Sequence, residues 1–137
     1  MSFSHASRDL AERIAATPAD DAYFFYPYMP MLPFLTARRH VSRYDIFTPG
    51  YTLPSQYKEA CVSAIRNASW LVIDRNWTDR EFLTTVFPAM RDPALEETRK
   101  FEQALEAGFE FVAREGPFEL RRRLRGVDDS VCAGITG

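Results

Sequence analysis

Apolar residues recur at helical spacing through much of the chain. In residues 55–68, for example, Tyr57, Cys61 and Ile65 fall on one face, as in an amphipathic helix. Pro18 cannot continue a helix without the loss of a hydrogen bond, and Gly108 is a good helix stop. We expect five helices, at residues 4–16, 31–39, 55–68, 78–87 and 93–108.

The remaining apolar segments predict strands. Tyr23–Tyr26 and residues 71–73 are continuous apolar runs, which suit strands covered on both faces, and 45–47 is a shorter run. Residues 109–113 and 118–122 flank the turn residues "EGP" and predict a hairpin. We therefore expect a three-layer α/β/α domain whose mixed sheet has about five strands, three of them parallel, plus the C-terminal antiparallel hairpin. The residues expected to be buried are Phe24, Phe25, Leu71, Ile73, Phe101 and Leu105.

The length and the charge of the chain narrow the classes of function. With 137 residues it is long enough for one hydrophobic core, and we assign residues 1–125 to a single α/β domain and residues 126–137 to a flexible tail. The net charge of −2 gives no field that favours nucleic acid. No apolar run approaches the ~20 residues that cross a bilayer, and the N-terminus lacks the apolar core of a secretion signal. We expect a soluble chain.

Cysteine and histidine are too scarce in the sequence for a metal site. Cys61, Cys132, His5 and His40 are the whole supply, so we expect no metal and no cofactor. Cys61 lies in a helical apolar pattern, which favours a buried thiol, and Cys132 lies in the Gly-rich tail. An oxidising compartment would permit a disulfide between the two, but nothing in the sequence argues for it.

Sequence motifs for nucleotide binding and for hydrolysis are absent. The six glycines are scattered, and neither G-x-G-x-x-G nor G-x-x-x-x-G-K occurs. The turn after the first strand, "PYMP", lacks the glycines that let a backbone approach a pyrophosphate. The chain has no G-x-S-x-G elbow and few histidines, which argues against a Ser-His-Asp triad. We expect no catalytic residue in this chain.

One segment resembles a known protein family. Residues 23–44 read "YFFYPYMPMLPFLTARRHVSRY": a strand that ends in "YP", a proline, the apolar helix "FLTARR" and then "RY". This pattern resembles the polytopic C-type membrane glycosyltransferases and is similar to dolichyl-phosphate-mannose protein mannosyltransferases and the aminoarabinose transferases of lipid A. In many bacterial members a small soluble α/β domain follows the transmembrane helices on the periplasmic side.

The resemblance implies a noncatalytic periplasmic domain of a longer membrane glycosyltransferase-like protein, at the bacterial inner membrane. The native protein would then begin upstream of Met1. The implied partners are the transmembrane part of that protein and a glycan or a polyprenyl-phosphate lipid. The family's acidic transfer residues lie in loops between membrane helices, which have no counterpart here. The alternatives are a free-standing small α/β enzyme and a protein-interaction module.

The expected ligand site is the carboxyl edge of the parallel strands, because open α/β sheets bind ligands there. The first strand leads to Tyr28, and the third strand leads to Asp74 and Trp77. An aromatic ring suits a sugar face, a carboxylate its hydroxyl groups, and arginines such as Arg38 and Arg39 a phosphate. We predict a binding surface made of these five residues.

The same residues also have structural interpretations. Asp74 suits a turn cap or an ion pair with Arg75, and Trp77 suits a cap on the core below the next helix. Arg38 and Arg39 suit the end of a helix, where positive charge is favourable. A second basic run begins within the last expected strand and continues beyond it, where it would blunt a sheet edge or face anionic lipid headgroups. Its members are Arg121, Arg122, Arg123 and Arg125.

Overall fold

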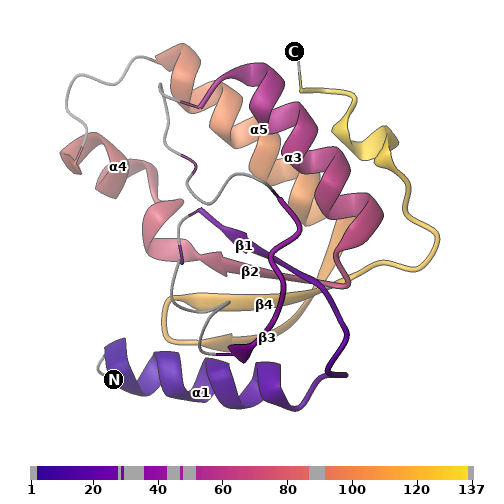
Figure 1. The fold of residues 1–137 in the computed structure, drawn as a ribbon. Coiled ribbons are helices and arrows are strands. Elements are labelled where there is room, and N and C mark those ends of the chain that lie inside the picture. Colours follow the sequence, from indigo (N-terminus) through magenta and orange to yellow (C-terminus); the bar gives the residue numbers. More distant parts are fainter. Residues whose placement is uncertain are drawn as a thin grey trace.

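The computed structural model describes residues 3–27, 29, 36–42, 47, 52–86 and 92–135, with the backbone alone for 3, 4, 80, 84, 86 and 92–94. These residues form a mixed α/β fold with four α-helices and a four-stranded sheet (Figure 1). The helices are α1 (Phe3–Ala15), α3 (Pro54–Asn67), α4 (Arg80–Val86) and α5 (Asp92–Gly108). The strands are β1 (Tyr23–Tyr26), β2 (Trp70–Asp74), β3 (Phe109–Glu115) and β4 (Phe118–Arg123), and the short 3-10 helices are η1 (Arg75–Trp77) and η2 (Asp129–Cys132). Within the described ranges, no helix combines the length and the apolar character that a bilayer crossing needs.

The sheet contains both parallel and antiparallel pairs, in the order β1–β2–β4–β3. β1 runs parallel to β2, with Tyr23 opposite Trp70 and Tyr26 opposite Ile73. β4 is antiparallel to both β2 and β3, and Gly116, at a φ of 58°, turns the chain between β3 and β4. The predicted parallel pair and the predicted hairpin are confirmed.

Two parts of the expected fold stay predictions. Most of the helix expected at 31–39 and of the strand expected at 45–47 lies outside the described residues. The described part of the chain contains a four-stranded sheet, so neither the fifth strand nor the complete three-layer arrangement is confirmed. At the outer edge of β1, a single parallel bridge joins Tyr23 to His40.

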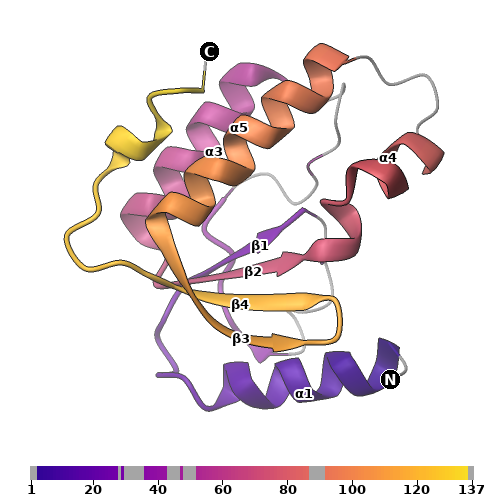
Figure 2. The ribbon, with the colours of Figure 1, turned by 180° about the vertical axis from the view of Figure 1, so that it is seen from behind.

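Apolar side chains pack on both faces of the sheet, because alternate residues of a strand point to opposite sides. One face is covered by α3 and α5 (Figure 2), and Phe24 and Leu71 belong to the core between them. On the other face, Phe25 packs with Leu10 and Ile14 of α1. All six apolar residues expected in the core are buried.

The residues after β4 pack against the rest of the protein, and the flexibility expected for residues 126–137 stays a prediction. Cys61 of α3 and Cys132 of η2 form a disulfide, with 5.9 Å between their Cα atoms. Both cysteines and Ile135 are buried in the core on the α3 side, and Val127 and Val131 pack against it. The expected free thiol at Cys61 is therefore wrong. Hydrophobic spacing correctly predicts that this residue is buried, but it carries no information about its partner.

Candidate functional site

The structure does not bring the predicted site residues together. The carbonyl oxygen of Arg39 accepts a hydrogen bond from the first residue of β1, so Arg38 and Arg39 lie at the amino end of that strand. Asp74 ends β2 and Trp77 follows in η1, at the carboxyl end. Because β1 and β2 are parallel, the two pairs lie at opposite ends of the sheet. Tyr28 lies outside the described residues.

Arg38 stabilises the end of α1. Its Nη2 atom donates to the carbonyl oxygens of Ile14, at 3.1 Å, and of Thr17, at 2.9 Å. The last carbonyl groups of a helix lack partners within it, and a positive charge there is favourable. Arg38 therefore stabilises a helix end, but the helix is α1, whereas the structural interpretation placed it at the end of the helix expected at 31–39. Arg39 is exposed, and its side chain has no hydrogen bond or ion pair with any described residue.

Asp74 and Trp77 also have structural partners. The carboxylate of Asp74 is buried and accepts a hydrogen bond from the backbone N of Asn76 at 3.1 Å, which caps η1. Burial raises the pKa of Asp74, and this hydrogen bond works in the opposite direction. Trp77 packs edge-on against Phe82 of α4, with 5.1 Å between the ring centroids. Both contacts agree with the structural interpretations of these residues.

Charged residues form a network at the carboxyl end of β2, on the α5 side. Arg75 donates to the carboxylates of both Glu119 and Glu106, and Arg121 donates to Glu119 as well. Burial opposes the ionisation of Glu119, but the two guanidinium groups outweigh it and lower its pKa. The charge of Arg75 is thus already matched by two carboxylates. This edge offers little to attract an anion.

Glu102 of α5 lies beside this network, and its carboxyl group stays protonated up to a higher pH than an ordinary glutamate does. The hydroxyl of Tyr26 donates to Oε2 of Glu102 at 2.8 Å. Burial raises the pKa of Glu102 from 4.5 to about 7, against the hydrogen bond from Tyr26 and the positive charge of Arg75. The negative charge of Glu106 raises the pKa of Glu102 further. Burial also raises the pKa of the nearby Tyr57, to about 12. The Tyr26–Glu102 pair is therefore neutral at acidic pH, and above neutral pH Glu102 becomes a buried carboxylate.

We expect Glu102→Gln to change the pH dependence of stability. Between pH 4.5 and 7 folded Glu102 holds a proton that the unfolded chain releases, so the wild type loses stability as pH rises through this window. A pKa displacement of this size corresponds to about 3 kcal/mol, most of it lost between pH 5 and pH 8. The variant cannot ionise and should match the wild type near pH 5 but exceed its free energy of unfolding by about 2 kcal/mol near pH 8.

Urea unfolding across this pH range measures the difference. Glu97→Gln, on the same helix, controls for the loss of one negative charge. If Glu102→Gln and the wild type lose stability in parallel from pH 5 to pH 8, Glu102 is not held neutral in the folded protein.

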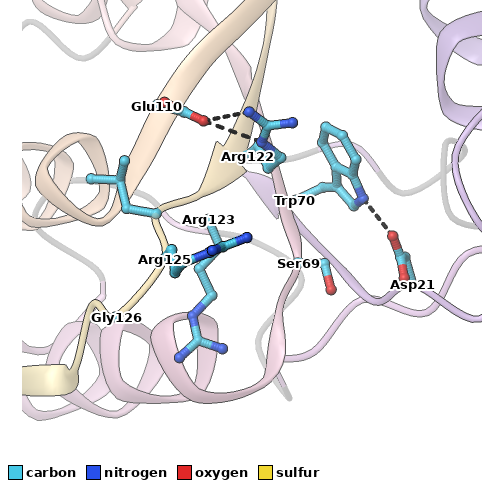
Figure 3. A pocket seen from close by; sticks show the side chains of 9 residues that line it. Asp21, Ser69, Trp70, Glu110, Arg122, Arg123, Arg125 and Gly126 are labelled. Atoms are coloured by element: carbon cyan, nitrogen blue, oxygen red, sulfur yellow. Dashed lines mark hydrogen bonds and ion pairs between the residues drawn. The ribbon is translucent and has the colours of Figure 1, made fainter.

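An open groove lies at the other end of the sheet, where β2 begins and β4 ends (Figure 3). Antiparallel pairing sets Trp70, the first residue of β2, opposite Arg122 near the end of β4. The groove has a volume of about 720 Å³. We call it the arginine groove, and its polar and aromatic groups come from Asp21, Ser69, Trp70, Glu110, Arg122, Arg123 and Arg125.

Three arginines line the groove, and the carboxylates of Asp21 and Glu110 offset part of their positive charge. Arg122 pairs with Glu110 of β3 at 2.6 Å, and Arg123 donates from Nη2 to the carbonyl oxygen of Val127 at 3.3 Å. Arg125 is exposed and has neither a hydrogen bond nor an ion pair with any residue that the structure describes. The exposed Arg122–Glu110 pair contributes little energy and exchanges readily for another anion. Guanidinium groups present planar forks of donors that match phosphate and carboxylate.

Trp70 and Asp21 lie across the groove from Arg123 and Arg125 (Figure 3). The indole Nε1 of Trp70 donates to Oδ2 of Asp21 at 2.8 Å. The ring of Trp70 stacks with that of Tyr23, with centroids 6.2 Å apart. These two contacts fix the orientation of the indole. A fixed aromatic side chain beside a carboxylate suits the apolar face and the hydroxyl groups of a sugar.

Comparison with known proteins adds no assignment to these residues. No family model, no curated protein and no solved structure matches the chain. Among the described residues, no group of three or more histidine, cysteine, aspartate and glutamate side chains is arranged to hold a metal ion. The candidate site therefore rests on its own geometry.

The groove cannot be read from the sequence pattern alone. The sequence shows the basic run, but it gives no sign that Trp70 and Asp21 lie beside these arginines. About 50 residues separate Trp70 from the arginines. The missing information is the position of β4 beside β2. Once that pairing is known, the end of one strand and the start of the other must be neighbours.

Proposed function

We propose that this chain is a noncatalytic recognition domain that binds an anionic sugar ligand in the arginine groove. The observation that carries the proposal is an open groove in which Arg125 has no partner within the described ranges. Arg122 and Arg123 lie beside it, so a phosphate or carboxylate group would meet several guanidinium donors. Trp70 and Asp21 then supply the apolar face and the acceptor for a sugar ring.

We infer further that the domain belongs to a membrane glycosyltransferase-like protein on the periplasmic side of the bacterial inner membrane. Two observations support this setting. Residues 23–44 resemble the C-type glycosyltransferases, and the Cys61–Cys132 disulfide suits an oxidising compartment. The ligand is then a glycan acceptor or a polyprenyl-phosphate lipid, and the partner is the transmembrane part of the same protein. The proposal retains a three-layer fold in which residues 45–47 supply a fifth strand.

Titration of the protein with glucose 1-phosphate, inorganic phosphate and glucose tests the binding proposal. We expect amide NMR shifts at residues 69–70 and 122–126, and a change in tryptophan fluorescence, with the phosphosugar the strongest ligand and glucose the weakest. Arg125→Glu should weaken glucose 1-phosphate binding by about tenfold or more, because it reverses the charge of an uncommitted guanidinium. Its folding should be unaffected, since the side chain is exposed.

Arg8→Glu is the matched control, because Arg8 is also exposed, lies in the first half of α1 outside the residues that line the groove, and has no polar partner in the described part of the chain. It should leave the affinity unchanged. An equal loss of affinity in both variants would indicate a general charge effect. The absence of groove shifts at about 10 mM glucose 1-phosphate would remove the site.

A further inference from the structure

The arginine groove and the disulfide are joined by one short segment of chain. β4 ends at Arg123, and the chain passes through Arg125 and Gly126 at the groove before it reaches η2, which carries Cys132. Only residues 127–131 separate Gly126 from Cys132. Arg123 and Arg125 form the side of the groove that faces Trp70, which we call the arginine wall, and its position depends on where η2 is held.

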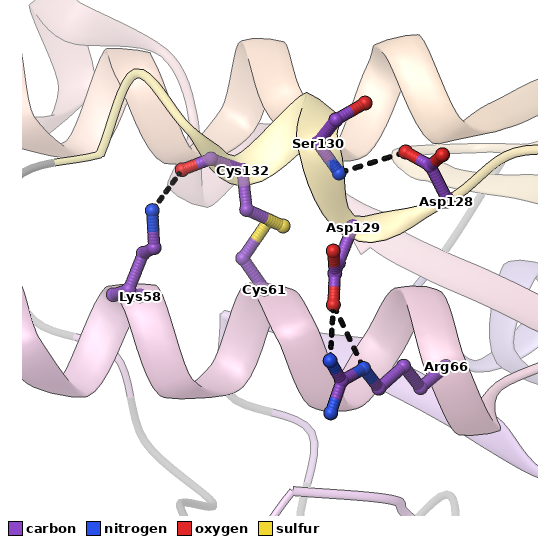
Figure 4. Close-up of a disulfide and its surroundings, with 7 residues drawn as sticks. All are labelled: Lys58, Cys61, Arg66, Asp128, Asp129, Ser130 and Cys132. Atoms are coloured by element: carbon purple, nitrogen blue, oxygen red, sulfur yellow. Dashed lines mark hydrogen bonds and ion pairs between the residues drawn. A yellow bond between two sulfur atoms is a disulfide. The ribbon is translucent and has the colours of Figure 1, made fainter.

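η2 is held on α3 by the disulfide and by two polar contacts (Figure 4). Lys58 donates from Nζ to the carbonyl oxygen of Cys132 at 2.9 Å, and Arg66 pairs with Asp129 at 2.6 Å. The side chain of Arg66 is 67% exposed, so its ion pair adds little. Apolar contacts of Val131 and the buried Ile135 add to these links. The covalent bond between the buried Cys61 and Cys132 is the strongest of them.

The groove end of the segment is anchored by noncovalent contacts alone, among them a hydrogen bond from Leu124 N to Gly108 O at 2.9 Å and the packing of Val127 against the core. Gly126 adopts a φ of 77°, which makes a tight turn. The turn is closed by a hydrogen bond from Val127 N to Leu124 O at 3.4 Å, and Arg123 Nη2 reaches Val127 O at 3.3 Å. Both distances are longer than those of ordinary hydrogen bonds. The turn therefore takes its position from β4 on one side and from η2 on the other.

We propose that the Cys61–Cys132 disulfide positions the arginine wall of the groove, so that ligand binding depends on its formation. This inference rests on the proposed function, because it concerns the regulation of the same site. Without the disulfide, η2 is held on α3 by side-chain contacts alone, and Arg125 changes its position relative to Trp70. Recognition by several guanidinium groups requires a fixed spacing between them. Disulfide formation and ligand binding therefore favour each other.

Formation of the bond removes two electrons and two protons from the thiols of Cys61 and Cys132. A thiol–disulfide oxidoreductase in its disulfide form accepts them and becomes a dithiol. Because both cysteines are buried in the folded domain, the completed bond is shielded from attack by thiolates in solution. The domain thus gains its binding activity on reaching an oxidising compartment and retains it there.

A Cys61→Ala/Cys132→Ala double variant tests the proposal with glucose 1-phosphate as the probe. We expect the amide shifts of β1 and β2 to be retained, those of residues 122–127 to change, and the affinity to fall about tenfold. Leu83→Ala is the control for a general loss of stability. Leu83 is buried on α4, which follows η1 from the carboxyl end of β2, so the control forms a core cavity away from the groove. It should retain the affinity of the wild type.

The outcomes separate this inference from the proposed function. If the oxidised wild type does not bind glucose 1-phosphate in the groove, the proposed function fails, and this inference fails with it. If the wild type binds and the folded double variant binds equally well, only the role of the disulfide is overturned.

If the cysteine variant does not fold, a Lys58→Ala/Asp129→Ala variant tests whether the other links between η2 and α3 position the arginine wall. It removes both polar links of η2 and keeps the disulfide. Its affinity should stay within about twofold of the wild type. A tenfold loss would show that these polar links, and not the disulfide, position the wall.

Discussion

Replacement of Cys61 and Cys132 together by alanine is expected to lower the free energy of unfolding by about 4 kcal/mol. The two cysteines lie 71 positions apart, so the bond closes a long loop in the unfolded chain and reduces its conformational entropy. Alanine keeps both buried positions apolar. Urea unfolding of the oxidised wild type and the double variant, followed by far-UV circular dichroism, measures the difference.

The single variants provide an internal control. Cys61→Ala and Cys132→Ala each abolish the same bond, so each should lose about as much stability as the double variant, and the two losses should not add. A wild type that is no more stable than the double variant under oxidising conditions would show that the bond does not form. Losses that add would show that the cysteines act through separate contacts.

Phe101→Ala is expected to lower the free energy of unfolding by about 3–5 kcal/mol. Phe101 is fully buried on α5 and lies at the centre of an aromatic cluster. Its ring centroid is 5.0 Å from that of Tyr57, 5.2 Å from Tyr26, 5.5 Å from Phe47 and 6.1 Å from Phe24. These rings come from different segments of the chain, so the surroundings cannot collapse into the space that the ring leaves.

Phe111→Ala is the matched control for this experiment. Phe111 lies on β3 and is 56% exposed, so the same substitution should change the free energy of unfolding by less than about 1 kcal/mol. Chemical denaturation of both variants, with the slopes compared, checks the prediction. Similar losses for Phe101→Ala and Phe111→Ala would contradict the position of α5 against the sheet.

The strands that pair locally or are wholly apolar could be predicted from the sequence. Tyr23–Tyr26 is buried at all four positions, which agrees with its unbroken apolar run. β3 and β4 are adjacent in the chain, so a short turn with Gly116 is enough to indicate their pairing. In both cases the information is carried by neighbouring residues, and hydrophobic spacing is a local signal.

The candidate site could not be predicted, because its geometry depends on contacts between distant segments. Arg38 lies near the end of the helix expected at 31–39, yet its partners are on α1 and the loop after it. The pairing of Cys61 with Cys132 depends on η2 reaching α3. The rule that ligands bind at the carboxyl edge of parallel strands also led away from the arginine groove. In this mixed sheet the basic residues come from an antiparallel strand and gather at the opposite end.

The order of the strands has a consequence for the biosynthesis of the domain. β2 lies inside the sheet between β1 and β4, and its second partner comes from residues 118–123, late in the chain. The bond to Cys132 comes later still. A nascent chain that has emerged only as far as α5 therefore exposes one side of β2 and lacks the closing strand. The complete sheet can therefore form only once nearly all of residues 23–123 are available.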